Sequence, residues 1–450
     1  MLFPAKARLA AAAAALSRAS GRGGGTTLPG RLLLGMQPDA IERLAAALPQ
    51  GAVAISATNG KTTTAKMAAS ILSPPLRLCR NAAGANLSSG VASALLAGRD
   101  AELGLFEVDE AALATVAPAL RPRAVVLGNL FRDQLDRYGE LELIGARWRD
   151  TAARLGAGSA LVCNADDPLV ASIGRDHQPR MWFGLDDPAL ALSAMQHASD
   201  SKWCVRCGGR YAYDAVYLGH LGAWHCPACG DARPPLDVAA REVRAEGLDA
   251  VSFRLDAGDR SMPVRLPLPG LYNVYNALAA AALCLQLGCD LERVRDGLEA
   301  FSAAFGRFER VRMAGGEAVL LLIKNPAGGN EVIRTLAAGS GPTTMLLALN
   351  DRIADGRDIS WIWDVDFEQL VPQIGRAVCT GTRAAEMGMR LKYAGLDPSA
   401  IVVDPDPSAA LAAIAGEPRS YLLATYTAML DLRRRLADQG LVRPFWEEAA

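Results

Sequence analysis

The chain has 450 residues, and its 47 basic and 48 acidic residues leave a formal net charge of −1. This balance excludes a protein that binds nucleic acid or an anionic membrane through its bulk charge. A hydrophobic content of 51% supports sizeable cores, and the length corresponds to roughly three domains.

The N-terminus carries a short apolar run that only loosely imitates a signal peptide. Lys6 and Arg8 precede this run at residues 9–16, but Arg18 and Arg22 follow it at once. We therefore predict a helix that packs on the first domain. No apolar run approaches the roughly 20 residues that span a bilayer. The sequence thus predicts no transmembrane segment and a cytoplasmic location.

The most informative segment is a phosphate loop after the first predicted strand. Residues 52–55 form an apolar run, residues 56–64 read Ser-Ala-Thr-Asn-Gly-Lys-Thr-Thr-Thr, and a helical pattern follows. Backbone N–H groups at such a turn and the positive end of the helix favour an anion. Lys61 adds a full charge, and Thr62 is positioned to offer its hydroxyl to Mg²⁺. The residues that we expect to bind the nucleotide here are Thr58, Asn59, Gly60, Lys61, Thr62 and Thr63.

The match to the general phosphate-loop motif is partial. The motif has a Gly six residues before its Lys, and Ile55 occupies that position. The alternative is an ordinary strand–turn–helix with a surface Lys. Gly-Lys-Thr between a predicted strand and a predicted helix favours the phosphate loop.

Carboxylates follow the next strands. Buried strands are predicted at 101–110, 124–130 and 159–167, each ending in polar residues, where open α/β sheets collect ligands. Mg²⁺ bound to a nucleotide takes carboxylate oxygens together with a Thr hydroxyl. Glu107 is the preferred ligand over Asp109 because it ends its strand. The alternative is a pair of solvated loop acids.

Two Cys-x-x-Cys pairs predict a metal site. Cys204 and Cys207 are separated from Cys226 and Cys229 by residues 208–225, a spacing typical of a four-thiolate Zn²⁺ site. Four thiolates leave no open coordination position, so this zinc would be structural. Zinc ribbons also bind nucleic acid. The segment at about 200–234 lacks a dense basic patch, so we favour a structural or docking insert.

Further polar residues stand out between the two predicted domains. A helix beginning near Asn273 brings Asn276 one turn later, and the two amides could contact a purine edge, although Asn is also a common helix cap. Arg307 lies between the domains and suits a phosphate or an acyl phosphate.

A second α/β unit is predicted beyond a hinge at residues 313–316. Its strands lie at 318–323, 345–350, 377–381, 400–404 and 421–425. Helical stretches between them are typical of a doubly wound sheet. We expect domains at 1–312 and 313–450. Residues 350–366, rich in Asp and Trp, are either a polar loop with buried tryptophans or, as we favour, a contact surface.

Taken together, these segments resemble the Mur ligase family of ATP-dependent amide-forming enzymes. The family loop Thr-Gly-Thr-Asn-Gly-Lys-Thr aligns with residues 56–62, and residues 164–167, 270–277 and 306–309 follow in family order. The resemblance covers nearly the whole chain. It implies a Mur ligase-like central ATPase domain with an inserted Cys₄ ribbon, followed by a doubly wound C-terminal domain.

The chain also departs from the usual family pattern. Members that add amino acids usually have Asp-His-Leu-Asp where residues 133–136 read Asp-Gln-Leu-Asp, and a His where this chain has Tyr272. No candidate for a carbamylated Lys is evident, and only about fifty residues precede the phosphate loop, so we expect no separate UDP-sugar domain. These departures fit an enzyme that does not add a free amino acid in the ordinary way.

The ribbon insert and the segments at 324–330 and 355–366 are similar to one branch of the family. The resemblance implies an ATP-dependent carbon–nitrogen ligase that phosphorylates the α-carboxylate of D-glutamate in the stem peptide of lipid II, at the inner membrane face. Ammonia from a GatD-type glutaminase partner then gives D-isoglutamine. Lys61, Glu107 and Arg307 are the expected catalytic residues of this chain. Asp355 would support the catalytic His of the partner, with Asp358 and Asp364 as substitutes.

Two alternatives remain at this stage. One is a Mur-like ligase of the folylpolyglutamate or cyanophycin synthetase type, which adds an amino acid without a glutaminase. The other is a nucleotide-binding scaffold whose zinc ribbon docks nucleic acid or protein.

Overall fold

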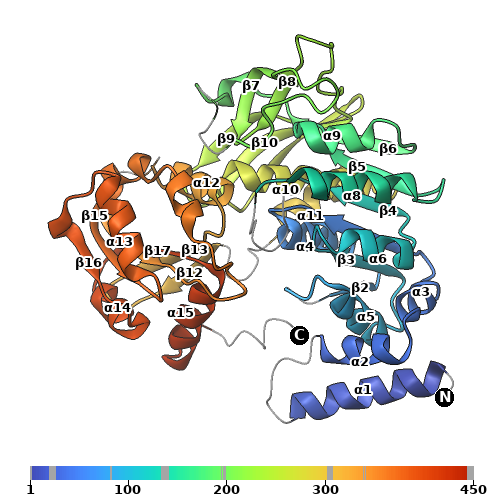
Figure 1. Ribbon diagram of the computed structural model, residues 1–450, viewed down its shortest axis with the longest axis horizontal. Helices are drawn as coiled ribbons and strands as arrows, with labels where there is room; N and C mark the ends of the chain where they lie inside the picture. The colour runs from blue at the N-terminus through green and yellow to red at the C-terminus, as the bar shows by residue number, and fades with distance from the viewer. Residues whose placement is uncertain are drawn as a thin grey trace.

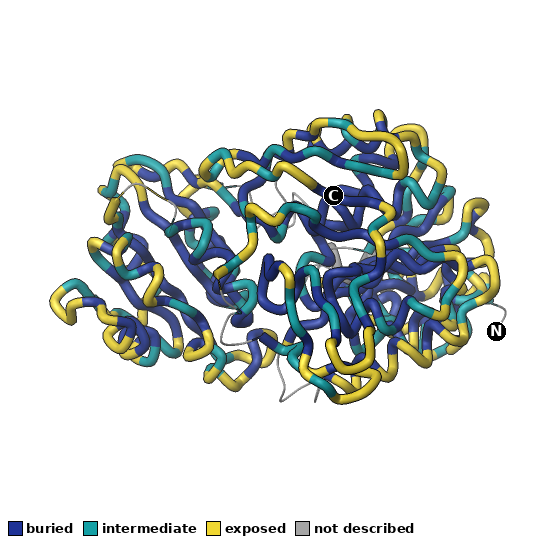
Figure 2. The backbone as a smooth tube through the Cα atoms, turned by 90° about the horizontal axis from the view of Figure 1, so that it is seen from above, coloured by how far each residue is buried: buried dark blue, intermediate teal, exposed yellow. Residues whose placement is uncertain are grey.

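Two α/β units make up the chain, the second of them drawn in orange and red in Figure 1. The computed structural model describes residues 3–19, 27–81, 84–132, 141–193, 195, 199–301, 308–337, 339 and 341–442, with the backbone alone for residues 13–19. In both units the buried segments lie in the interior and the exposed segments lie along the outside (Figure 2).

The first unit is built on a nine-stranded sheet with the strand order β11-β10-β9-β6-β5-β4-β1-β3-β2. Strands from β2 to β9 across this sheet run parallel to their neighbours, and β10 and β11 extend it as antiparallel strands. The strands are β1 (Ala52–Ser56), β2 (Leu78–Arg80), β3 (Leu103–Glu107), β4 (Ala124–Leu127), β5 (Ala160–Asn164), β6 (Arg180–Leu185), β9 (Val238–Glu246), β10 (Ala250–Ala257) and β11 (Arg260–Leu266).

Helices cover both faces of this sheet. One face packs against α4 (Lys61–Leu72), α10 (Leu271–Gln286) and α11 (Leu291–Glu299). The other packs against α3 (Ala40–Ala45), α5 (Ser88–Ala97), α6 (Leu113–Leu120), α8 (Leu141–Ala153) and α9 (Pro168–Gly174).

Strand β1 explains why the predicted strands are continuous apolar runs. Val53 and Ile55 join the core on one face, and Ala52 and Ala54 join the core on the other. A parallel strand that is buried on both faces needs an apolar side chain at every position.

The N-terminal helix is confirmed. Helix α1 (Phe3–Ala19) packs on α2 (Leu28–Met36), with Ala7 and Ala10 buried in a small core that includes Leu33 and Leu96. Within the described part of the chain, none of the helices has the length and apolar character needed to cross a bilayer.

The second unit has a six-stranded sheet with the order β12-β13-β17-β14-β15-β16, parallel except for β12. Its strands are β12 (Phe308–Arg312), β13 (Glu317–Leu322), β14 (Thr343–Ala348), β15 (Ile374–Thr380), β16 (Ile401–Val403) and β17 (Arg419–Ala424). Helices α12 (Pro326–Ala337) and α13 (Ala384–Tyr393) cover one face, and α14 (Pro407–Ile414) and α15 (Tyr426–Asp438) cover the other. All five predicted strands of this doubly wound unit are present.

The division at residue 312 remains a prediction. Residues 308–312 pair with β13, so the second sheet begins before that point, and residues 313–316 form the turn of the hairpin.

A two-stranded ribbon stands apart from both sheets. It pairs β7 (Ala212–Leu218) with β8 (Leu221–His225) and lies at the top of Figure 1.

Candidate active site

The phosphate loop connects β1 to α4, as the sequence predicts. Gly60 precedes the helix with a φ of +89°, in the left-handed region that glycine tolerates best. A methyl group at this position would also lie 1.9 Å from Asn276 Oδ1. Backbone conformation and close packing therefore both require Gly here.

Lys61 is buried at the start of α4 and paired with an acid that we did not expect. Its Nζ lies 2.6 Å from Glu110 Oε2 and donates to the backbone carbonyls of Ala57 and Thr58. Burial by itself lowers the pKa of Lys61, but Glu110, Asp109 and Glu107 together outweigh that effect and raise it. Burial likewise raises the pKa of Glu110, while Lys61 and Lys324 lower it to a greater extent. The lysine is therefore held as a cation inside the site.

Two further carboxylates lie near Lys61 in addition to Glu110. Glu107 ends β3, paired in register with Ile55 of β1, and is buried together with Asp109. The negative charges of both residues also raise the pKa of Lys61. Three carboxylates beside two lysines leave a surplus of negative charge, which fits a divalent cation with oxygen ligands. Thr62, in the first turn of α4, offers a hydroxyl on the same loop.

Two segments fasten the loop. Within the first unit, Thr58 exchanges hydrogen bonds with the backbone of Phe131, and Asn59 N donates to Asn129 Oδ1 at 2.9 Å. From the second unit, Asn325 and Asn59 exchange amide hydrogen bonds of 3.0 and 3.4 Å, and Lys324 Nζ donates to Thr58 O at 3.2 Å. The loop is thus one of the places where the two units meet through polar contacts. Elsewhere, Arg334 of α12 donates to Tyr217 O, and Arg310 of β12 donates to Leu248 O.

A pocket opens beside the loop, and the space in it, together with solvent at its mouth, amounts to about 750 Å³. Its lining combines loop residues, the ribbon end of the first unit and helix α12 of the second unit. The lining residues are Asn59, Gly60, Thr63, Asn129, Phe131, Leu218, Leu221, Tyr272, Tyr275, Asn276, Leu322, Lys324, Ala327, Gly328, Glu331 and Val332. A mainly apolar pocket with a phosphate loop at one end suits a nucleotide.

The two asparagines of α10 differ in position. The helix begins at Leu271, two residues before the predicted start, so both lie inside it. Asn276 lines the pocket and accepts from Thr64 Oγ1 at 3.5 Å. Asn273 does not line it: its amide donates to Pro269 O at 2.7 Å, and its Oδ1 accepts from Asn276.

Glu331 of α12 is a buried carboxylate in the pocket wall. Only 1% of the residue is exposed, and Arg334 Nη2 lies 2.8 Å from Oε2. Burial raises the pKa of Glu331 to about 7, and Arg334 offsets only part of that effect.

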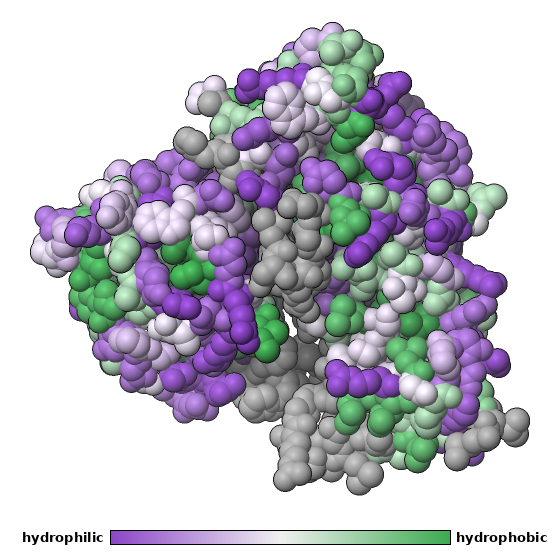
Figure 3. All heavy atoms as spheres, viewed as in Figure 1, coloured by the Kyte–Doolittle hydropathy of each residue, from purple (hydrophilic) through white to green (hydrophobic). Residues whose placement is uncertain are grey.

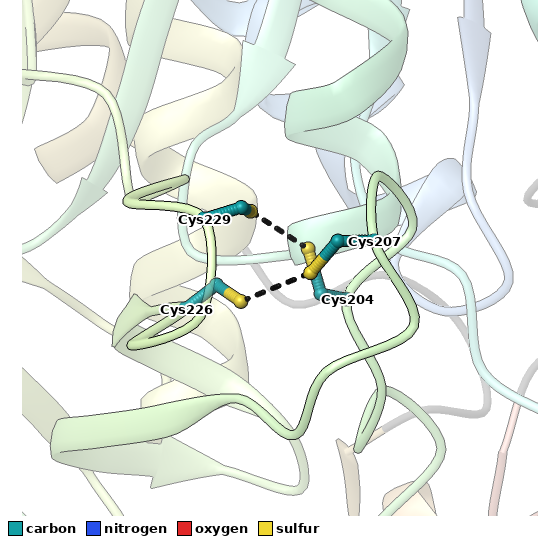
Figure 4. Close-up of side chains that lie close together, drawn as sticks. All are labelled: Cys204, Cys207, Cys226 and Cys229. Carbon is teal, nitrogen blue, oxygen red and sulfur yellow. Dashed lines mark hydrogen bonds between the residues drawn. The ribbon is translucent and has the colours of Figure 1, made fainter.

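The four cysteines come together as predicted (Figure 4). All four Sγ atoms lie within 4.8 Å of one another. The Sγ–Sγ distance is 3.7 Å between Cys204 and Cys229 and 3.5 Å between Cys207 and Cys226. Thiolates on a tetrahedral Zn²⁺ lie about 3.8 Å apart, because each Zn–S bond is about 2.3 Å. The cysteines therefore fit a closed zinc site.

The two knuckles share one backbone geometry. Gly208 N donates to Cys204 O, and Gly230 N donates to Cys226 O. Both glycines have a φ of +73°, as a tight turn of this kind requires.

The ribbon is anchored on the first unit. Trp224 Nε1 donates to Ala165 O at 3.0 Å, and Arg233 Nη1, shortly after the ribbon, donates to Asp166 Oδ1 at 3.0 Å. Within the first unit, Tyr275 Oη of α10 donates to Asp166 Oδ2 at 2.7 Å. Burial raises the pKa of Asp166 to about 6, although these donors oppose the shift.

Asp355 lies in the second unit, away from the pocket lining. It is buried and accepts from Thr427 N at 2.7 Å and from Thr427 Oγ1, and burial raises its pKa. Asp358 and Asp364 are exposed. Arg307 and residues 133–136 lie outside the described residues.

Sequence reasoning missed three residues of this site. Glu110 falls within the predicted strand at 101–110, but β3 ends at Glu107 and Glu110 lies in the loop that follows. Lys324 belongs to a segment noted only for its family likeness, and Glu331 follows it in α12. A Lys directly after a buried strand was the one usable signal, because that position predicts the sheet edge where ligands bind.

Comparisons with known proteins agree with this geometry. Residues 55–219 match the family model of the Mur ligase middle domain, and residues 322–429 match that of the MurT ligase C-terminal domain. The MurT subunit of the glutamine-hydrolyzing lipid II isoglutaminyl synthase of Streptococcus pneumoniae (strain ATCC BAA-255 / R6) is 32% identical over 432 residues, 94% of either chain. The subunit of the same name from Staphylococcus aureus (strain N315) is 33% identical over 399 residues, 88% of either chain.

A solved structure supports the fold. The MurF ligase of Thermotoga maritima in complex with ADP superposes with a TM-score of 0.64, covering 90% of this chain and 84% of that chain at 14% identity. At this identity the likeness concerns the fold alone.

Fold, phosphate loop and pocket together define a ligase of the Mur type. Within that class, the identity and coverage of the relatives are decisive: the chain belongs to the MurT family.

Proposed function

We propose that this chain is the ATP-binding subunit of a lipid II isoglutaminyl synthase. A carboxylate oxygen of D-glutamate in the stem peptide attacks the γ-phosphorus of ATP, releasing ADP and forming an acyl phosphate. Ammonia then attacks the carbonyl carbon and expels phosphate, leaving D-isoglutamine. The observation that carries this proposal is a phosphate loop with a buried, cationic Lys61, whose neighbours Asn59, Gly60 and Thr63 line a pocket between the two units of a MurT-family chain.

The residues of the loop have separate roles. Gly60 allows the backbone N–H groups to approach the phosphates, and Lys61 offsets charge on the transferring phosphoryl group. Glu107 and Thr62 are the residues that would hold Mg²⁺, which supplies further charge stabilisation when bound. Lys324 adds a second cation from the other unit. Arg307 is proposed to contact the acyl phosphate.

Asn276 and the apolar wall formed by Leu218, Leu221 and Tyr272 are proposed to hold the nucleoside part of ATP. Asn273 would act indirectly, by orienting the Asn276 amide.

Ammonia is proposed to come from a GatD-type glutaminase. In the described part of the chain, none of the hydrogen bonds or ion pairs of a histidine side chain involves a cysteine. His177 bonds Ser159 O, and the nearest carboxylates lie 3.3 Å from His220 and 3.4 Å from His225. Without a Cys–His pair in that part, a partner is the simplest source of ammonia.

The segment at 350–366 is proposed to face this partner. Ile353 and Trp363 are 74% and 49% exposed, and Tyr393 of α13, which contacts the Trp363 ring, is 72% exposed. Exposed aromatic residues of this kind are typical of interfaces. Asp355 would orient the catalytic His of the partner, as carboxylates do in catalytic triads. For this role, the Asp355 carboxylate would have to accept a hydrogen bond from that His in place of one of the two that it accepts from Thr427.

The Cys₄ site is proposed to hold structural Zn²⁺, and the chain is proposed to work in the cytoplasm at the inner face of the membrane. Membership of the MurT family favours amidation with ammonia over addition of an amino acid.

The test uses the chain with a co-expressed glutaminase partner, lipid II, ATP and glutamine. We expect an ATP-dependent mass decrease of lipid II that corresponds to replacement of a hydroxyl by an amino group. Ammonium should substitute for both glutamine and partner. ATP hydrolysis that needs a free amino acid instead, with no amidation, would favour the amino-acid ligase.

A further inference from the structure

The first zinc knuckle presents an apolar and basic surface to solvent. Trp203 is 64% exposed and Val205 is 44% exposed. Trp203 forms an isolated antiparallel bridge with Arg210, which places the two residues side by side. Figure 3 shows hydrophobic and strongly hydrophilic residues next to each other at the top of the view, where Figure 1 places the ribbon.

The contrast with the other ribbon tryptophan is informative. Trp224 is only 2% exposed, packs against Tyr211 and donates its indole N–H to Ala165 O. Trp203 therefore does not serve the internal packing of the ribbon in the way that Trp224 does.

The charged side chains of the knuckle, apart from its cysteines, are all basic. Residues 202–210 contain Lys202, Arg206 and Arg210 and no acid. Among the described residues, the one salt bridge of these three cations joins Arg206 to Asp231 at 3.8 Å, and Asp231 is already paired with Arg175 at 2.7 Å. The knuckle thus presents three cations beside a Cys₄ site, whose four thiolates on Zn²⁺ would together carry a net charge of −2.

We propose that this knuckle, defined by residues 202–210, docks on an anionic lipid bilayer. The proposal rests on the proposed function, because it gives the enzyme contact with the membrane that holds a lipid-linked substrate. Trp inserts at the interface between lipid and water, and basic side chains bind anionic headgroups. Three cations around an exposed Trp combine both properties.

The ribbon also connects this surface to the pocket. Leu218 and Leu221, at the turn of the β7–β8 hairpin, line the pocket, and the knuckle precedes the other end of β7. A seven-residue strand spans about 23 Å. A membrane at the knuckle would therefore lie within about one strand length of the nucleotide. The bonds of Arg233 and Trp224 to the first unit hold the ribbon in that orientation.

A single-stranded nucleic acid is the competing partner. Such binding uses several aromatic residues on which successive bases stack. The knuckle offers one exposed ring, so the bilayer is favoured.

The experiment measures co-sedimentation of the complex of this chain and its glutaminase with vesicles of phosphatidylglycerol and phosphatidylcholine, and with phosphatidylcholine alone. We expect binding to the anionic vesicles that weakens with salt. The R206A/R210A variant should bind them about 30-fold more weakly, because each basic side chain contributes about a fivefold factor. Trp203→Ala should weaken binding about tenfold. Arg77→Ala and Leu143→Ala, which remove an exposed cation and an exposed apolar side chain elsewhere, should bind like the wild type.

Zinc content and amidation of a water-soluble stem peptide are measured on each variant. Both should stay at wild-type values, while amidation of vesicle-borne lipid II falls with vesicle binding. Unchanged vesicle binding in the knuckle variants overturns the proposal. So does binding of a single-stranded oligonucleotide that the same variants abolish. If vesicle binding behaves as expected but no acceptor is amidated, the proposed function fails and the membrane surface stands.

Discussion

The loops after β1 and after β14 occupy equivalent places, each at the carboxyl edge of a parallel sheet, yet they differ in what they expose. After β1, Lys61 is buried, and its charge is matched within the chain by Glu110. After β14, Asp355 is buried against Thr427, while Ile353 and Trp363 of the same segment face solvent. The first loop completes its site with groups of this chain. The second presents exposed apolar side chains next to a buried carboxylate, and we propose that a partner completes it.

The strongest way to break this comparison is to remove the charge at the first loop. Lys61→Met should lower amidation on the order of 10²–10³-fold, because a charge that stabilises the transferring phosphoryl group is lost. It should also destabilise the fold by about 3 kcal/mol, because the buried charge of Glu110 loses its paired cation and keeps only the influence of Lys324.

The double variant K61M/E110Q separates these two effects. It should recover stability in thermal unfolding and remain inactive. Lys66→Ala, on the same helix, is the matched control and should retain activity. A double variant with restored amidation would contradict a role for Lys61 in catalysis.

The second loop is tested through the partner. Asp355→Asn should lower glutamine-driven amidation about 10²-fold or more, because a triad His without its carboxylate is poorly oriented. Amidation driven by added ammonium should stay at the wild-type rate, since the phosphate loop is intact. Asp358→Asn and Asp364→Asn test the two substitute carboxylates of the same segment, which are exposed, and both should keep the wild-type rate. A selective loss in either of them would transfer the role from Asp355 to that residue. Equal losses with glutamine and with ammonium would mean that Asp355 serves only the fold of this unit.

Features of these two loops that depend only on neighbouring residues in the sequence could be predicted. Strands β1, β4 and β14 are buried on both faces, so each is a continuous apolar run that can be recognised locally. The Gly60–Lys61 turn is equally local, because it needs only a strand before it and a helix after it. The four cysteines were also found correctly, because metal-ligand spacing is fixed within short knuckles.

The pairs that cross the chain could not be predicted in this way. Lys61 meets Glu110 and Asn59 meets Asn325 only after the sheets have formed. The short strand β2 and the edge strand β12 were missed because few of their residues are buried. In the segment at 350–366, Trp361 is half-buried and Trp363 is exposed, so burial of the tryptophans holds only in part, and the contact surface stays a prediction.

The zinc ribbon offers a third test, since it is the one part whose fold depends on a predicted metal. Cys207→Ser should abolish zinc binding, measured by metal analysis, and lower the stability of the ribbon by several kcal/mol. Leu218 and Leu221 line the pocket, so the affinity for ATP should fall as well. The control variant Cys289→Ser, which changes a cysteine outside the cluster, should bind zinc like the wild type. Wild-type protein without zinc after purification in the absence of chelator would refute the site.

Glu331 predicts a pH dependence of stability. Its pKa is about 7 in the folded chain, above the ordinary value of 4.5. Below about pH 4.5 the group is neutral in both states and has no effect. As the pH rises toward 7 only the unfolded state ionises, so the wild type loses about 3 kcal/mol, at 1.36 kcal/mol for each pKa unit.

We therefore compare the unfolding temperatures of Glu331→Gln and the wild type at two pH values. The advantage of Glu331→Gln over the wild type should be larger at pH 8 than at pH 5. Glu386→Gln, a partly exposed acid of the same unit, should show no such trend. Parallel stability profiles for Glu331→Gln and the wild type would show that Glu331 is ionised in the folded chain at pH 5.

The smallest expected effect concerns the contact between the two units. It tests how far the phosphate loop depends on residues of the second unit. Asn325→Ala removes the amide pair with Asn59, in which each side chain donates to the other. A hydrogen bond of this kind contributes about 1 kcal/mol, so the KM for ATP should rise about fivefold with little change in kcat. Gln369→Ala, an exposed amide of the same unit, should leave both values unchanged. If kcat falls while KM stays constant, Asn325 acts in the transition state. The first loop would then depend on the second unit for its chemistry and not only for holding the nucleotide, and the contrast between the two loops would be one of degree.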